Sequence, residues 1–272
     1  MKKILRKILP KRLIIFFSYI FNYRVKPYSI RSQIFPSLEY SDFFILMNNA
    51  EENIFIAENI YGLLEGKPIN VVHMIRFYSS NGKLIKSQAY ETNDLIVRLP
   101  LPKFNLEDPY ISFTHSIKSN ELLSKNIDNK LKRNLISFQH RGYTLIKKRS
   151  DSLGSIVHGN VGAIKTKKCK QSSLKIKNQL FNYTPVYKFE CENHYHLVFN
   201  NPTNKLLEIQ IKLVDAKEDP KIYLKICPFG NGYIEIVNYI GMISFESKLA
   251  ICRCIIFKNP DLERINFDVF HS

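Results

Sequence analysis

The segment PINVVHMIRFYSS (68–80), followed by Asn81-Gly82 and then by KLIKSQAYE (83–91), decides the fold class of this chain. Apolar and polar residues alternate along both halves, as they do in strands that bury one face. Asn-Gly is a favoured pair at the centre of a two-residue hairpin turn, where both residues need positive φ angles. The segment therefore predicts two antiparallel strands joined by a tight turn.

Similar short strands are predicted along most of the chain from about residue 40 onward. They are separated by turn-forming residues such as Pro, Asp, Asn and Gly. The pattern is typical of a β-sandwich or an open barrel, and it needs no long helix. The further predicted strands are 93–101, 109–117, 196–201, 206–216, 221–229, 233–241, 243–257 and 264–272.

The predicted strands fall into two groups with a similar order. One group ends on ISFTHS (111–116) and the other on FDVFHS (267–272). An internal duplication would explain this similarity, and the alternative is a chance match between two β meanders. We therefore expect a mainly β fold made of two packed antiparallel β-sandwich-like units.

The sequence predicts four successive segments. A short, basic, amphipathic helical arm spans 1–40, and the two β units span 41–118 and 181–272. Between the units, 119–180 is a basic connecting segment that contains a further hairpin with its turn at 149–154. With 272 residues, of which 45% are hydrophobic, the chain is large enough to bury the cores of both units.

Positive charge is concentrated in two segments of the chain. Residues 1–31 contain nine Lys or Arg and no acid, and residues 125–177 contain fourteen Lys or Arg against two acids. Because the whole chain has a formal net charge of +16, the remainder is net acidic. This segregation favours two cationic surfaces that face an anionic partner.

The leading segment MKKILRKILPKR (1–12) has the pattern of a helix that lies on a charged interface. The apolar run that follows, 13–21, is too short to cross a bilayer, which takes about 20 residues. No small-residue cleavage site follows it, so we expect a cytoplasmic protein that is peripheral at the inner face of the cell membrane. A solvated basic arm before a buried helix is the alternative. The predicted membrane-binding residues are Lys2, Lys3, Ile4, Leu5, Arg6, Lys7, Ile8, Leu9, Lys11 and Arg12.

The hairpin of the connecting segment is the predicted binding site for an acidic ligand. Arg141 offers a planar fork that can hold a phosphate or carboxylate through two hydrogen bonds. Antiparallel pairing places His158 opposite Thr144 or Leu145. His140 is then far away along the hairpin, so the two histidines cannot share a metal ion. The predicted ligand-binding residues are His140, Arg141, Tyr143, Lys147, Lys148, Arg149, His158 and Asn160.

A second candidate site lies in CENHYH (191–196). On a strand, His194 and His196 point to the same face about 6 to 7 Å apart, close enough to bind one zinc or iron ion. A third ligand must come from elsewhere, and solvated or core histidines are the alternative interpretation. The candidate third ligands are His271, His115, Glu192 and Cys191.

Several other functions lose support from the sequence. It contains no Walker A, dinucleotide-binding, nucleophile-elbow or H-E-x-x-H motif. Its five cysteines form no C-x-x-C pair, which argues against a disulfide framework or a cysteine zinc site and favours a reducing compartment. Single-stranded nucleic acid is a rival partner for the basic segments, because Tyr143 and His140 could stack on bases.

Together these features predict a binding or accessory protein at the cytoplasmic membrane surface. The basic start resembles that of cytoplasmic-face enzymes of bacterial envelope glycan assembly. The basic segments imply an acidic ligand, and this resemblance implies a glycan ligand and a role in envelope polysaccharide metabolism. We expect no cofactor. The alternatives are a His-coordinated metal-dependent enzyme that uses zinc or iron, and a protein that binds single-stranded nucleic acid.

Overall fold

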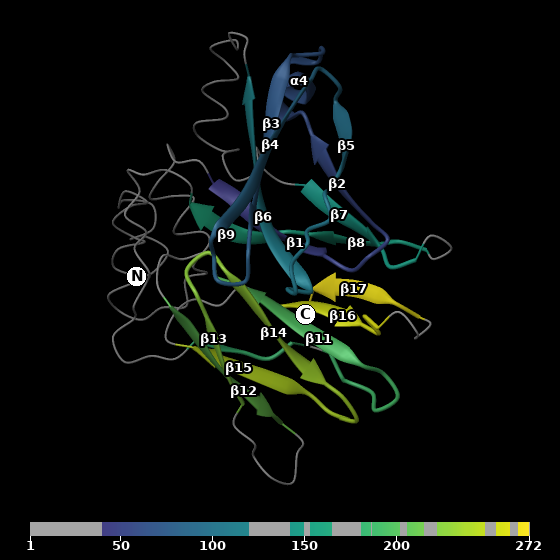
Figure 1. Ribbon diagram of the computed structural model, residues 1–272, viewed down its shortest axis with the longest axis vertical. Coiled ribbons are helices and arrows are strands. Elements are labelled where there is room, and N and C mark those ends of the chain that lie inside the picture. The colour runs from purple at the N-terminus through teal and green to yellow at the C-terminus, as the bar shows by residue number, and fades with distance from the viewer. Residues whose placement is uncertain are drawn as a thin grey trace, which may run out of the picture.

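A computed structural model of the chain describes residues 40–119, 142–149, 153–164, 181–185, 187–201, 206–214, 222–247, 254–261 and 266–271. These residues form a mainly β protein, as the sequence predicts, with one β unit above another (Figure 1). The predicted helical arm and much of the predicted connecting segment lie outside the described residues. No helix of the described part is long and apolar enough to span a membrane.

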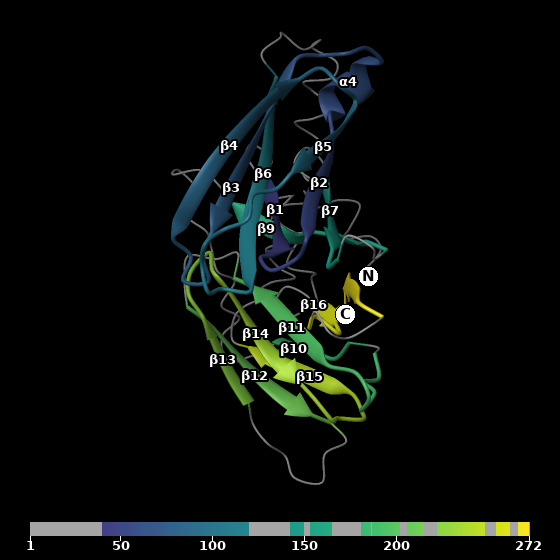
Figure 2. The same ribbon diagram turned by 45° about the vertical axis from the view of Figure 1, so that its right-hand side comes forward.

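The first unit consists of β1 (Tyr40–Met47), β2 (Glu52–Glu58), β3 (Val71–Tyr78), β4 (Leu84–Thr92), β5 (Ile96–Pro100), β6 (Tyr110–Ser119), β7 (Gly142–Lys147), β8 (Ser155–His158) and β9 (Asn160–Ile164). One sheet has the order β4-β3-β6-β1-β9 and the other β5-β2-β7-β8. The two sheets form two layers (Figure 2). One short helix, α4 (Ile60–Glu65), follows β2.

The second unit consists of β10 (Phe181–Tyr183), β11 (Tyr195–Asn200), β12 (Leu207–Leu213), β13 (Ile222–Ile226), β14 (Asn231–Ile236), β15 (Ile243–Ser247), β16 (Ile255–Lys258) and β17 (Asp268–His271). Its sheets have the orders β10-β15-β12-β13 and β14-β11-β16-β17. All the strand pairs are antiparallel, from Phe43↔Thr114 in the first unit to Lys258↔Asp268 in the second.

The two units share one topology. Increasing each first-unit strand number by nine converts the orders β4-β3-β6-β1 and β5-β2-β7-β8 into the two sheets of the second unit. The hairpin predicted in the connecting segment, β7-β8, is thus an integral part of the first unit. The common strand order supports the internal duplication.

Local details follow the same correspondence. Asn59 and Asn201 each follow the second strand of their unit and are fully buried. Their backbone N–H groups donate to Leu95 O and Gly230 O, each over 2.9 Å. Each asparagine side chain also donates to a backbone carbonyl, that of Ile69 or that of Ile226.

The predicted match between ISFTHS (111–116) and FDVFHS (267–272), however, is wrong. ISFTHS (111–116) lies in β6, whose counterpart is β15, and β15 also begins with Ile-Ser-Phe at residues 243–245. FDVFHS (267–272) contains β17, whose counterpart is β8. His271 in β17 therefore corresponds to His158 in β8, because each is the last residue of its strand.

The described residues form four hydrophobic clusters, a small one of Tyr61, Ile69, Val71 and Ile117 and three larger ones. Two of the larger clusters lie between the two sheets of a unit, one cluster in each unit. The third, which we call the inter-unit core, contains residues of both units, including Ile45, Met47 and Tyr110 of the first and Val198 and Phe257 of the second. The two units therefore bury apolar surface against each other as well as within themselves.

The inter-unit core explains why some strands have no alternating pattern. In β1, Phe44 and Leu46 face the core of the first unit, whereas Ile45 and Met47 face the inter-unit core. A strand buried on both faces is a continuous apolar run, so β1 was not predicted as a strand.

The predicted long strand 243–257 is wrong, because β15 and β16 belong to different sheets.

The hairpin predicted at 68–91 is confirmed, and its tip contacts the second unit. β3 pairs with β4, but of the two residues predicted to have positive φ at the turn only Gly82 does, with a φ of 79°, so the predicted two-residue turn is wrong. A Cβ at Gly82 would lie 1.8 Å from Pro228 O, and a Cβ at Gly230 would lie 2.0 Å from Ser80 O. These two glycines allow the backbones of the two units to approach each other this closely.

Candidate metal site

The site is built on β11, whose two faces point in different directions. Tyr195, Leu197 and Phe199 enter the core of the second unit. His196 and Val198 lie on the opposite face, toward the first unit. Strand alternation thus places His196 at the boundary between the units, where it is 8% exposed.

Glu235 on β14 is the direct cross-strand neighbour of His196. Its carboxylate oxygens lie 3.5 Å from His196 Nε2 and 4.0 Å from His194 Nε2. His194 lies just before β11, and the potential ligand atoms of the three residues are all within 4.8 Å of one another. The structure thus brings the predicted His194 and His196 together with a carboxylate.

The Nδ1 atom of each histidine lies within hydrogen-bond distance of another side chain. His194 Nδ1 lies 2.5 Å from Asp261 Oδ2, and His196 Nδ1 lies 2.7 Å from Tyr110 Oη. Both Nε2 atoms are buried, and neither has a hydrogen-bond partner among the described residues. Metal-binding histidines typically use one ring nitrogen for an orienting hydrogen bond and the other for the metal.

The backbone at His194 is fixed by Asn259, which follows β16. The His194 N–H donates to Asn259 Oδ1 over 3.0 Å, and the Asn259 N–H donates to His194 O over 2.6 Å. Asn259 adopts a positive φ of 50° and donates from its side chain to Asn193 Oδ1 over 2.9 Å. These contacts hold His194 in place before any ligand arrives.

The protonation states suit a metal site. Burial lowers the pKa of His196 to about 4, with a smaller contribution from His194. The imidazole of His196 is therefore neutral near pH 7, which is the form that binds metals. Burial, and next the neighbouring Tyr233, raise the pKa of Tyr110 well above its usual value, so its hydroxyl keeps its proton.

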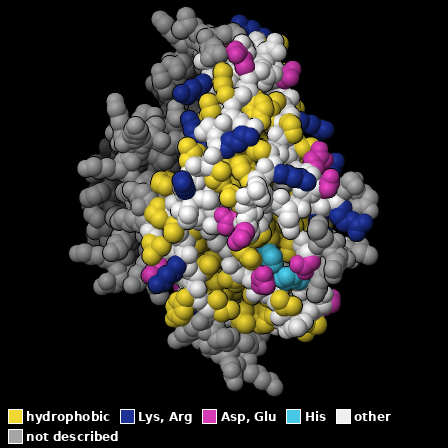
Figure 3. Space-filling view, viewed as in Figure 1, with side chains coloured by type: hydrophobic (Ala, Val, Ile, Leu, Met, Phe, Trp, Pro, Cys, Tyr) yellow, Lys and Arg dark blue, Asp and Glu magenta, His cyan; other side chains and the backbone are white. Residues whose placement is uncertain are grey.

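The site can be reached from solvent. The Glu235 side chain is 53% exposed, whereas those of His194 and His196 are 12% and 10% exposed. Figure 3 shows histidine side chains at the surface of the second unit, beside acidic side chains. A ligand could therefore approach the open side of the cluster.

The third ligands predicted from the sequence are elsewhere. His271 lies beside His158, with ring centroids 4.1 Å apart, and its Nε2 is 2.7 Å from His158 O. His115 is buried in the first unit, with its Nε2 2.9 Å from His73 Nδ1. Glu192 and Cys191 are exposed in the turn before β11 and lie outside the cluster.

Sequence reasoning missed Glu235 because its signal depends on strand pairing. Glu235 is one polar residue in the alternating strand YIEI and lies far along the chain from His196. Only the register between β11 and β14 makes the two residues neighbours. Asp261, which follows β16, and Tyr110, which lies in the first unit, were missed because only tertiary contacts bring them to the histidines.

The predicted acidic-ligand site is only partly described. His140 and Arg141 lie outside the described residues, as does the side chain of Asn160, which begins β9. His158 pairs with Tyr143, one residue away from the predicted partners. Tyr143 itself is exposed.

The three consecutive basic residues at 147–149 do not form one cationic surface. Lys147 forms an ion pair with Glu52 over 2.8 Å. Lys148 is 2% exposed and donates to Asn259 O over 2.8 Å. Strand alternation explains this difference, because it turns Lys148 inward and leaves Arg149 exposed. Binding of an acidic ligand to this segment stays a prediction.

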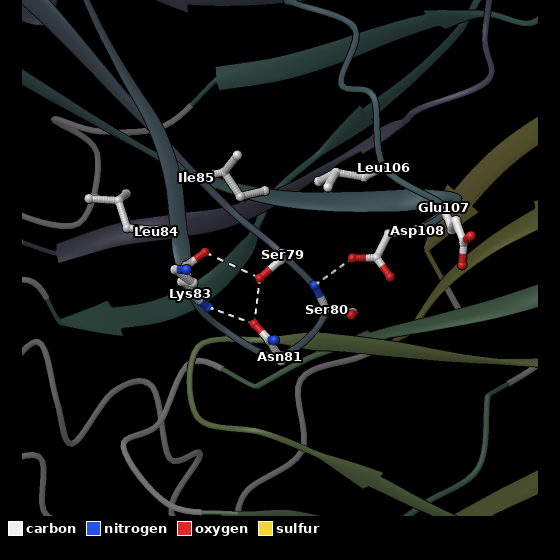
Figure 4. A pocket seen from close by; sticks show the side chains of 9 residues that line it. All are labelled: Ser79, Ser80, Asn81, Lys83, Leu84, Ile85, Leu106, Glu107 and Asp108. Atoms are coloured by element: carbon white, nitrogen blue, oxygen red, sulfur yellow. Dashed lines mark hydrogen bonds between the residues drawn. The ribbon is translucent and has the colours of Figure 1, made fainter.

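A groove of about 620 Å³ lies beside the β3-β4 turn (Figure 4). Its apolar lining is Leu84, Ile85 and Leu106. The Ser80 N–H donates to Asp108 Oδ2 over 3.1 Å. Polar residues that line the groove thus stabilise the β3-β4 turn. The groove is therefore a weaker candidate for a functional site than the histidine cluster.

Among the residues that the structure describes, the corresponding face of the first unit carries no such cluster. Ile54 and His196 each lie five residues before the equivalent asparagines of the two units. By the same count Glu52 corresponds to His194, and strand register places Pro100 opposite Ile54 as Glu235 lies opposite His196. The shared fold therefore does not by itself require polar residues at these positions.

Comparison of the chain with models of known protein families and with curated proteins finds no match.

Proposed function

We propose that the protein is a metal-dependent enzyme whose metal ion is held by His194, His196 and Glu235. The observation that carries this proposal is the convergence of two buried, unpartnered Nε2 atoms of the described residues on one carboxylate. A buried polar atom without a partner costs free energy, and a metal ion would satisfy both nitrogens at once.

The residues that the structure describes supply three ligands, a number that favours catalysis over a structural role. Structural zinc sites usually have four protein ligands, whereas catalytic sites have three and leave a position open. Imidazole and carboxylate groups suit zinc and also iron(II). Such an ion, when bound, can polarise a substrate oxygen or lower the pKa of a bound water to about 7.

The residues of the chain have separate tasks in this proposal. His194 and His196 bind through Nε2, and Asp261 orients His194 through its Nδ1. Glu235 supplies a negative charge that offsets part of the charge of the cation, and its exposure leaves room for a substrate beside it. The substrate class stays open at this stage.

Elemental analysis tests the proposal. The purified chain is incubated with zinc or iron(II), desalted and analysed, and we expect about one equivalent of metal for the wild type. Glu235→Gln should lower the metal content without threatening the fold, because Glu235 is half-exposed. His196→Ala should abolish metal binding.

His158→Ala is the matched control, because His158 is an exposed histidine outside the cluster. This variant should retain the metal. A wild-type chain that retains no metal, or a His196→Ala variant that retains as much as the wild type, would refute the proposal. The predicted membrane-binding residues, from Lys2 to Arg12, lie outside the described residues, and membrane docking stays a separate prediction.

A further inference from the structure

Tyr110 belongs to the first unit but contacts the candidate ligands of the second. It begins β6, is 1% exposed, and lies with its Oη 2.7 Å from His196 Nδ1. Its ring packs on Phe257, with centroids 4.6 Å apart. Tyr110 is therefore part of the inter-unit core and also a direct partner of His196.

The direction of this hydrogen bond decides which nitrogen of His196 can bind a metal ion. A neutral imidazole carries one proton, and the nitrogen without the proton is the ligand. If Nδ1 donates its hydrogen to Tyr110 Oη, the lone pair of Nε2 faces Glu235 and is free for the metal. The hydrogen bond to Tyr110 can therefore select the metal-binding tautomer and fix the ring orientation.

Tyr110 is itself fixed by the strand that carries Glu235. The Asn231 side chain on β14 donates to Tyr110 O over 3.3 Å and to Ser112 Oγ over 2.9 Å. Ser112 Oγ in turn donates to Asn200 Oδ1 on β11 over 3.0 Å. These hydrogen bonds cross between the units, so the position of Tyr110 depends on how the units pack.

We infer that Tyr110 is a positioning residue for the metal ion, so that the site on the second unit is completed by the first. This inference rests on the proposed function. Metal binding and packing of the two units are then linked, because a ligand that favours one arrangement of a site stabilises that arrangement.

Tyr233 offers a matched comparison on the same histidine. Its ring stacks on His196, with centroids 4.9 Å apart and an interplanar angle of 29°. In the described part of the chain its hydroxyl forms no hydrogen bond with His196. Tyr110→Phe removes an orienting hydroxyl, whereas Tyr233→Phe removes a hydroxyl and leaves the ring contact with His196 intact.

The test measures zinc affinity by competition with a chromogenic chelator, using the full chain. We expect Tyr110→Phe to weaken zinc binding by about 10- to 100-fold, the usual effect of removing an orienting partner, and Tyr233→Phe to change it much less. Cobalt(II) substitution adds a spectroscopic readout, because the visible absorption band should shift in Tyr110→Phe if the imidazole is no longer oriented. A merely structural tyrosine would not shift this band.

The outcomes separate the two proposals. If the wild type binds neither zinc nor cobalt, the proposed function fails. If the wild type binds and Tyr110→Phe has the same affinity and the same cobalt spectrum, the proposed function stands and the role of Tyr110 is refuted. Equal weakening by Tyr110→Phe and Tyr233→Phe would also refute it, since the loss of any hydroxyl near the site, and not of the bond to His196 Nδ1, would then explain the effect.

Discussion

The two units have the same strand order, yet each uses its buried histidines differently. In the first unit, His73 Nδ1 and His115 Nε2 are 2.9 Å apart and bond to each other. In the second, the Nδ1 atoms of His194 and His196 are held by outside partners and both Nε2 atoms face Glu235. A pair of histidines that bond to each other stabilises a core, whereas a pair that converges on a carboxylate offers an ion a site.

The contrast locates the function in side chains and not in the fold. Where the second unit has His194, His196 and Glu235, the first has Glu52, Ile54 and Pro100. Glu52 is used in an ion pair with Lys147. The same scaffold thus carries a structural surface in one unit and a candidate site in the other.

The largest effect is expected at the contact between the units. Gly82→Ala places a Cβ 1.8 Å from Pro228 O at a φ of 79°, so strain and a backbone clash combine. We expect a loss of about 3 kcal/mol or more in the free energy of unfolding. Chemical denaturation measures it.

Gly66→Ala is the control for backbone strain alone. Gly66 has a φ of 69°, but a Cβ there would meet nothing within 4 Å. Its loss should be about 1 kcal/mol. Equal losses for the two variants would mean that the close approach of Gly82 to Pro228 contributes nothing to stability.

The histidine pair of the first unit predicts a pH effect. Burial lowers the pKa of His73 to about 4, from an ordinary histidine value of about 6.5. Between these values the unfolded chain binds more protons than the folded one, so stability falls as the pH falls through this window. The contribution of His73 should be about 2 kcal/mol lower at about pH 5 than at about pH 7.5.

His73→Asn removes this titration while keeping a side chain that can hydrogen-bond to His115. The difference between wild type and variant in the free energy of unfolding, measured at both pH values, isolates the contribution of His73. An identical pH dependence in the two proteins would contradict the assignment.

Two adjacent lysines give the smallest predicted effect. Lys148 is buried and donates to Asn259 O, the backbone of the residue that fixes His194. Lys148→Met should cost about 1 to 2 kcal/mol by leaving this carbonyl unpaired. Lys147→Met should cost less than about 1 kcal/mol, because the ion pair with Glu52 is solvent-exposed.

Denaturation of both lysine variants sharpens the comparison between the units. Lys148 lies in the first unit but supports the site of the second, so Lys148→Met should also weaken zinc binding. If Lys147→Met weakens zinc binding as much, a general charge effect and not the contact with Asn259 would be responsible.

The sequence carried the local features of this fold well. β3, which buries one face, was predicted from its alternation, and β4, which has no buried residue, was predicted with it from the Asn-Gly turn. β1 was missed because the inter-unit core covers its second face, and nothing in the run FFILM shows where a second unit will pack. The contact between the units thus explains why β1 lacks the alternation of apolar and polar residues that predicts a strand.

The candidate site was predictable only where its residues are neighbours in the chain. His194 and His196 share a strand face, so their spacing sufficed. Glu235, Asp261 and Tyr110 reach them through strand pairing and through the contact between units, which single-sequence spacing does not specify. Lys148 showed the opposite error, since its charge suggested a surface and its place in the alternation buried it.

X-ray absorption spectroscopy of the zinc-loaded full chain tests the central claim most directly. We predict a zinc ion with two imidazole ligands, Zn–N distances of about 2.0 to 2.1 Å and further oxygen ligands. The spectrum of His194→Ala should show scattering from one imidazole ligand instead of two. The spectrum of His158→Ala should still show both. A spectrum without imidazole scattering, or one dominated by sulfur ligands, would contradict it.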